Sequence, residues 1–174
     1  MYRYVGPTSV RSQAENAGTL ITSVSDLDAW LTPMRKHGAP SDAVSIVCTF
    51  VIDEVGALRV ADRASEHVAC ANGGPVMSAG EMTFAHSVVG SRVEEVSNQS
   101  TGYCPEPKSW SSVVAALDAI PLPHPDGFTL VYQFRRCPIC GQINLIKDDD
   151  YTCAVCEAKL PRQWNVDPES VDAR

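Results

Sequence analysis

The sequence predicts an α+β protein in which an antiparallel β-sheet with few helices is completed by a small, cysteine-rich C-terminal unit. Three observations predict this class. A long apolar run is followed by an alternating stretch, helical features are confined to two segments, and four of the seven cysteines lie within residues 135–156. We therefore expect an α+β domain at residues 1–132, a cysteine-rich unit at 133–162 and a tail at 163–174.

The first third of the chain predicts one short helix and one hairpin. In "SVSDLDAWLTPMRKHG", residues 23–38, Ser25 can cap a helix whose first turn is acidic, and Pro33 ends it early. The apolar run at 43–52, the turn "DEVG" and the alternating stretch at 58–61 follow. They predict a β-hairpin whose first strand is buried on both faces.

The next segment predicts a strand through Met82, a turn at Gly90 and a returning strand through Val93 and Val96. These two valines lie three positions apart, so strict alternation fails. The pattern therefore requires a β-bulge, or else the second strand is absent.

The strongest helix signal lies at 110–117, where apolar residues recur at i, i+3, i+4 and i+7. Ser109 can cap this helix and Pro121 stops it. After a proline-rich linker, "FTLVYQF" at residues 128–134 predicts a strand that runs into the cysteine-rich unit.

That unit contains two Cys-x-x-Cys pairs separated by twelve residues, Cys137 with Cys140 and Cys153 with Cys156. Paired thiolates at this spacing can converge on one ion, whereas an odd cysteine count without an export signal argues against a disulfide framework. The residues between the pairs predict a small hairpin that cannot fold by burial alone, so metal binding would supply the missing free energy. Four thiolates leave no open position, which favours structural Zn²⁺ over a catalytic ion, with iron as the alternative.

The motif resembles the zinc-ribbon family over residues 135–160, through "CPICG" and "CAVC". Only the first pair is followed by glycine, because position 157 is Glu. The resemblance implies a structural zinc ion, and members of the family serve in nucleic-acid contact, protein docking or stability. Basic and acidic side chains balance around this unit, which disfavours phosphate recognition. In the tail, Trp164 can pack the ribbon against the main domain or meet a partner.

The charge balance of the chain indicates which classes of partner are unfavourable. The chain has 174 residues and 14 Lys and Arg against 21 Asp and Glu, which gives a formal charge of −7. Nucleic acid and anionic membranes are therefore unfavourable partners. The sequence has no apolar run of membrane-spanning length and no signal-peptide layout at its start, so we expect a cytoplasmic protein.

A polar loop, "SNQSTGYCPEP" at residues 97–107, lies between the second strand and the helix at 110. Its hydroxyls, amides and phenol can form a ligand site, or they can cap their own turn.

Residues 73–120 resemble the core of the plant IQ-motif calmodulin-binding proteins and related uncharacterised bacterial proteins, in which an Ala-Gly strand leads to a Ser-Gly-His-Tyr-x-Pro loop. Here Ser100, Tyr103 and Pro105 fit that loop, but Thr101 and Gly102 replace Gly-His, so no role of the histidine carries over.

Two functions follow as hypotheses. The first is a non-enzymatic zinc-binding interaction protein that binds another protein through its acidic domain and its ribbon. The alternative is a small enzyme or ligand-binding domain whose pocket is formed by His67 and the Ser97–Tyr103 segment; its candidate residues are His67, Glu81, Asn98, Ser100 and Tyr103. His67 and Cys70 can also act as base and nucleophile, although free cysteines are more often simply buried. Common nucleotide, metalloprotease and serine-hydrolase motifs are absent, so the sequence leaves open whether the protein is an enzyme.

Overall fold

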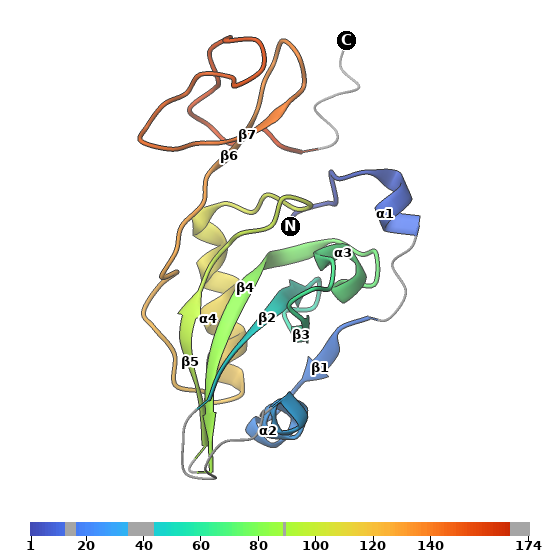
Figure 1. Ribbon diagram of the computed structural model, residues 1–174, viewed down its shortest axis with the longest axis vertical. Helices are drawn as coiled ribbons and strands as arrows, with labels where there is room; N and C mark the ends of the chain where they lie inside the picture. The colour runs from blue at the N-terminus through green and yellow to red at the C-terminus, as the bar shows by residue number, and fades with distance from the viewer. Residues whose placement is uncertain (13–16, 35–43, 89, 168–174) are drawn as a thin grey trace.

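The computed structural model describes residues 1–12, 17–34, 44–88 and 90–167. A five-stranded, fully antiparallel sheet with the order β1-β3-β2-β4-β5 forms the main domain, and a two-stranded sheet, β6-β7, begins the ribbon at one end of the molecule (Figure 1). The α+β class is confirmed. The strands are β1 (Thr19–Ile21), β2 (Val44–Asp53), β3 (Leu58–Asp62), β4 (Val76–Ser87), β5 (Gly90–Val96), β6 (Phe134–Arg136) and β7 (Ile143–Leu145).

The helices are few, as predicted. They are α1 (Thr8–Ser12), α2 (Val24–Leu31), η1 (Thr32–Met34), α3 (His67–Cys70), η2 (Pro107–Ser109) and α4 (Trp110–Ala119). Among the described residues, none of the helices has the length and apolar character that crossing a lipid bilayer requires.

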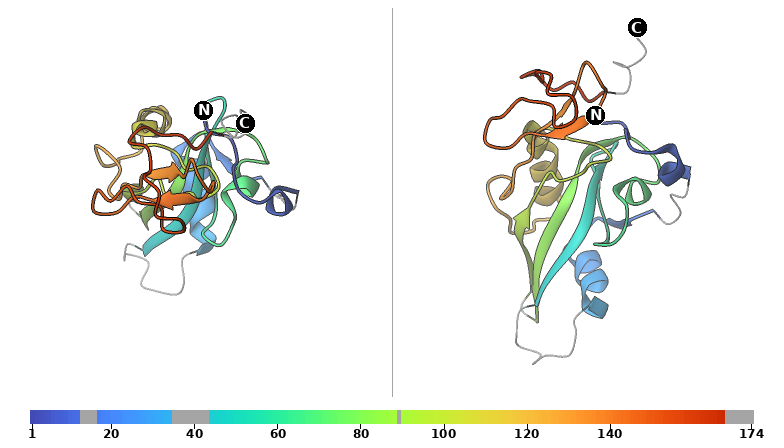
Figure 2. Two further views of the ribbon diagram at one scale, coloured as in Figure 1. Left: turned by 90° about the horizontal axis from the view of Figure 1, so that it is seen from above. Right: turned by 45° about the horizontal axis from the view of Figure 1, so that its top comes forward.

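One face of the large sheet carries the main core. Leu31 of α2, Leu117 of α4 and Phe50 of β2 belong to this core, and all three are fully buried. The other face is covered at one end by α3, the N-terminal segment and the loop at 98–105, so that α3 and α4 lie on opposite sides of the sheet (Figure 2). Phe50, Val51 and Ile52 are consecutive and each fully buried, which confirms that β2 is buried on both faces.

The bulge expected from Val93 and Val96 is present. Thr83 pairs with Glu95 but Phe84 pairs with Val93, so the β5 residue between them is extra. The extra residue lets both valines, each at most 4% exposed, point into the core.

Neither predicted residue makes the expected side-chain cap bond. Ser23, not Ser25, caps α2, because its side chain accepts the backbone N–H of Asp26 at 3.1 Å. Ser109 has helical dihedral angles and makes no cap bond, since η2 already begins the helical turn at Pro107; its hydroxyl instead contacts Ser78 Oγ at 3.0 Å. The predicted stop holds, since α4 ends before Pro121.

The strand predicted at 128–134 is also mostly absent. Only Phe134 belongs to a strand, β6, and Leu130 makes a single bridge to Ser97. Leu130 and Val131 are more than half exposed, so this apolar stretch passes along the surface instead of entering the sheet.

Candidate metal centre

The four cysteines of the two Cys-x-x-Cys pairs come together in the ribbon. Their sulfur atoms all lie within 4.8 Å of one another, with Cys137 to Cys156 at 3.5 Å and Cys140 to Cys153 at 3.6 Å. Four sulfurs around one zinc ion at about 2.3 Å form a tetrahedron with edges of about 3.8 Å, so the spacing fits a single ion. All seven cysteines are free thiols. We call these four the cysteine cluster.

Each pair lies in a knuckle, and the two knuckles have the same backbone. In the first knuckle, residues 137–142, Cys137 N–H donates to Gln142 C=O at 2.8 Å and Gly141 N–H to Cys137 C=O at 2.9 Å. In the second knuckle, residues 153–158, the equivalent bonds are Cys153 N–H to Ala158 C=O at 2.8 Å and Glu157 N–H to Cys153 C=O at 2.9 Å. The two halves of the cluster are thus built as copies of one turn.

In this turn, the residue after the second cysteine adopts the left-handed backbone conformation, with a positive φ angle. Gly141 has φ 78° and Glu157 has φ 59°. Glycine adopts this conformation freely, whereas a side chain there costs about 1–2 kcal/mol. Glu157 is therefore strained at the position where the first knuckle has glycine.

Backbone amides point at the sulfurs and favour the thiolate form that a metal requires. N–H groups of Cys156 and Val155 lower the pKa of the Cys153 thiol to about 6. In the same way, N–H groups of Cys140 and Ile139 lower the pKa of Cys137. Each knuckle therefore prepares its first cysteine as a ligand.

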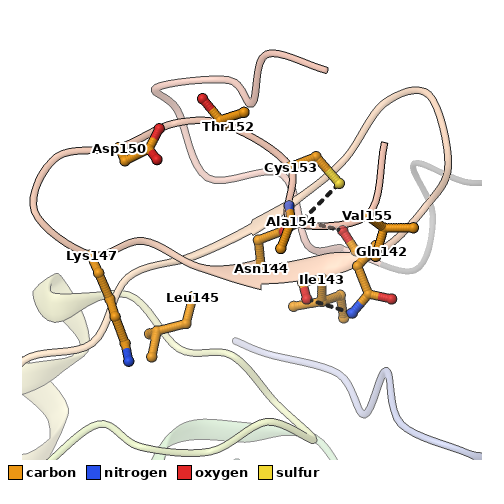
Figure 3. A pocket seen from close by; sticks show the side chains of 10 residues that line it. All are labelled: Gln142, Ile143, Asn144, Leu145, Lys147, Asp150, Thr152, Cys153, Ala154 and Val155. Atoms are coloured by element: carbon orange, nitrogen blue, oxygen red, sulfur yellow. Dashed lines mark hydrogen bonds between the residues drawn. The ribbon is translucent and has the colours of Figure 1, made fainter. Parts of the chain in front are cut away.

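Asn144 is a cluster neighbour that the sequence analysis missed. It is 7% exposed, and its amide donates to Cys153 Sγ at 3.6 Å (Figure 3). No sequence signal marks it, because a single Asn between Ile143 and Leu145 has the alternating pattern of any half-exposed strand.

Arg135 holds the ribbon's two ends together. Its guanidinium, in a residue 6% exposed, donates to the carbonyls of Pro161, Arg162 and Phe134. Arg162 in turn pairs with Asp149 at 2.9 Å. The side chains of Arg135 and Arg162 therefore both make their polar contacts within the ribbon.

Trp164 packs the ribbon against the main domain. Its indole N–H donates to Cys104 C=O at 2.8 Å, and its ring meets Tyr2 edge-on with 5.4 Å between centroids. The fully buried Val166 packs beside it. The tail up to residue 167 thus forms part of the junction.

The candidate residues of the main domain make separate local contacts. His67 Nε2 bonds Gly80 C=O at 3.0 Å, whereas Tyr103 OH donates to Gly74 C=O at 2.7 Å. Glu81 pairs with Arg63 at 3.2 Å and lines a cavity of about 190 Å³ on the sheet surface, which Ser97 also lines but His67 and Tyr103 do not.

Asn98 and Ser100 lie in the interior. Asn98, fully buried, accepts Tyr132 N–H at 2.7 Å and donates to the carbonyls of Tyr132 and Pro105, both at 2.8 Å. Ser100 Oγ is buried without a hydrogen-bond partner among the described residues. Asn98 thereby ties the polar loop to the linker that leads into the ribbon.

His67 and Cys70 share α3 without forming a nucleophile pair. Cys70 is fully buried, and burial raises the pKa of its thiol to about 12. Burial also lowers the pKa of His67. A thiol with so high a pKa is a poor nucleophile.

Searches with the chain gave no significant match to a protein-family model, a curated protein or a solved structure. The resemblance to zinc ribbons is therefore supported only by the geometry of the cysteine cluster. The resemblance of residues 73–120 to the IQ-motif proteins has no support from these comparisons.

Proposed function

We propose that the protein binds one structural Zn²⁺ through Cys137, Cys140, Cys153 and Cys156. The observation that carries the proposal is the convergence of four thiols from two equivalent knuckles to within 4.8 Å. Four thiolates complete a tetrahedral shell, so the ion would hold the ribbon together and would have no open position for a substrate. The cytoplasm, a reducing compartment, suits four reduced thiols, and we place the protein there.

Metal analysis tests this proposal. Protein purified without chelators should contain one zinc per chain, and Cys140→Ser should lose most of it. Cys104→Ala, which changes a buried thiol outside the cluster, should keep it. Iron with a visible thiolate absorption would replace zinc in the proposal, and wild-type protein that contains neither metal yet keeps an ordered ribbon would end it.

We further propose that the ribbon binds a partner protein, with an extended segment of that partner lying along β7. Cys137 N–H pairs with Gln142 C=O and Ile146 N–H with Gln133 C=O, so alternation directs the main chain of Ile143 and Leu145 away from β6. The Ile143 carbonyl accepts a hydrogen bond from the Gln142 side chain. On this side, the main-chain groups of Leu145 make no hydrogen bond to any of the described residues. An open strand edge of this kind can accept a further strand.

A groove of about 400 Å³ lies along this edge (Figure 3). It is lined by Gln142, Ile143, Asn144, Leu145, Lys147, Asp150, Thr152, Cys153, Ala154 and Val155. Val155 is 67% exposed and Leu145 38% exposed, so apolar side chains border the main-chain groups that a strand would pair with. The metal would fix both walls of the groove.

Proline substitution tests the partner's mode of binding. Leu145→Pro removes an N–H that faces the groove and makes no bond to β6, whereas Leu145→Ala keeps it. A partner isolated with wild-type protein should bind Leu145→Ala and fail to bind Leu145→Pro, with zinc content equal in all three. Equal binding to both variants would refute the strand-addition mode.

The alternative pocket around His67 and residues 97–103 remains a prediction from the sequence. The contacts of its candidate residues favour local structure over a shared cleft.

A further inference from the structure

We infer that Asn144 is a positioning residue of the metal centre, which holds the second knuckle in register with the first. This inference depends on the proposed metal site. It adds that the affinity of the site is set partly by a side chain that is not itself a ligand.

The contacts of Asn144 join the two knuckles. Its Nδ2 donates to Gln142 C=O at 2.9 Å, at the end of the first knuckle, and to Cys153 Sγ at 3.6 Å in the second. Its Oδ1 accepts the N–H of Ala154 at 3.0 Å, also in the second knuckle (Figure 3). One amide therefore fixes where the second pair of cysteines sits relative to the first.

The orientation of this amide follows from its neighbours. The Ala154 N–H can only donate, so the Asn144 oxygen must face it, and the amide nitrogen is left for the sulfur. Aspartate would keep the bond to Ala154 but would place a second acceptor against the sulfur. Alanine would leave the Ala154 N–H without this partner.

Charge explains why a donor at Cys153 matters. Four thiolates around a divalent ion leave a net charge of −2, and N–H groups directed at sulfur stabilise that charge. Backbone amides supply such groups in both knuckles. Within the described part of the chain, the side-chain N–H bond to a cluster sulfur comes from Asn144, which is only 7% exposed.

The experiment compares Asn144→Ala and Asn144→Asp with a matched control, Asn165→Ala. Asn165 makes the same kind of amide clamp, accepting Arg136 N–H at 2.9 Å and donating to Arg136 C=O at 2.7 Å, but these bonds join the tail to β6. Zinc affinity is measured by competition with a chromophoric chelator. The thiolate-to-metal charge-transfer band is recorded in Co²⁺-loaded protein.

We expect Asn144→Ala to weaken zinc binding about tenfold to a hundredfold and to shift the Co²⁺ charge-transfer band. Asn144→Asp should weaken binding at least as much, because it retains the Ala154 contact but repels the thiolates. Asn165→Ala should lower thermal stability while leaving the affinity and the band near wild-type values.

Three results would count against the inference. Zinc affinity of Asn144→Ala within about threefold of wild type would overturn it. So would an equal loss in Asn165→Ala, because the effect would then be general loosening of the ribbon. If Asn144→Ala does not fold, Asn144→Asp decides, and an unchanged affinity and band in that variant refute the role. Wild-type protein that binds no zinc would instead refute the proposed function.

Discussion

Among the described residues, the sheet domain has eighteen buried residues in its main apolar cluster, whereas the cluster inside the ribbon has three, Cys137, Cys153 and Leu160. Two of those three are proposed metal ligands. The sheet can therefore fold by removing apolar surface from water, but the ribbon has almost no such surface of its own. With the proposed metal bound, the ribbon would be stabilised mainly by metal–thiolate bonds and the sheet domain by its apolar core, so each could be destabilised separately.

Metal removal should have the largest effect and should be confined to the ribbon. A strong chelator withdraws on the order of 10 kcal/mol from a small thiolate unit, so backbone amides at 134–160 should lose their protection from hydrogen exchange. Amides of β2 and β4 should stay protected, because their core does not include the cysteine cluster. Protection that persists in the ribbon after complete metal removal would contradict the comparison.

Leu117→Ala should produce the opposite pattern. This side chain is fully buried in the main core, and truncation should cost about 2–5 kcal/mol of unfolding free energy, measured with denaturant at constant zinc. Zinc affinity at low temperature should be unchanged. A matching loss of zinc affinity would mean that the two regions are not independent.

Trp164→Phe tests how the ribbon is held against the sheet domain. Phenylalanine keeps an aromatic ring against Tyr2 but loses the bond to Cys104 C=O, which should cost about 1–2 kcal/mol. Trp110→Phe, which alters a ring packed on Phe128 in the main core, serves as the control. Only the Trp164 variant should increase hydrogen exchange of the loop at 98–105.

Glu157→Gly should stabilise the zinc-loaded protein by about 1 kcal/mol, because glycine removes the left-handed strain. Gly141→Ala should destabilise the first knuckle by a similar amount. Melting temperatures of the two variants should move in opposite directions, and a fall in both would show that the side chain of Glu157 has a favourable role.

The smallest effect concerns pH and belongs to the sheet domain. Burial lowers the pKa of His67 below its unfolded value of about 6.5, so the folded form resists protonation. Protonation of His67 should thus leave the free energy of unfolding independent of pH well above pH 6.5 and should lower it as pH falls from there toward the folded pKa. His67→Gln keeps an N–H for Gly80 C=O without titrating. On acidification, wild type should therefore lose unfolding free energy relative to His67→Gln; a difference that stays constant with pH would contradict this role.

The parts predicted correctly were those where local pattern and burial agree. The run through β2 has few polar interruptions. The spacing of Val93 and Val96 limited the choice to a bulge or an absent strand, and the bulge is present. The cysteine spacing revealed the cluster, because few other structures need that pattern.

Apart from the two caps, the errors arose where a residue distant in sequence decides the outcome. The stretch at 128–134 has strand-forming residues, but Asn98 satisfies the main chain of Tyr132 with its side chain and leaves Leu130 outside the sheet. Asn144 was missed for the same reason, since its contacts are to Ala154 and Cys153 in the second knuckle. Local sequence patterns do not predict contacts between residues that are far apart in the sequence.

The edge-on contact between Tyr2 and Trp164 joins residues from nearly opposite ends of the chain. Closing so long a loop is entropically slow unless the intervening segments are already compact. The packing of the ribbon against the sheet domain should therefore form late during folding. A chain still emerging from the ribosome can form its sheet and even fill its cluster, but it can complete this aromatic contact only after residue 164 has been released.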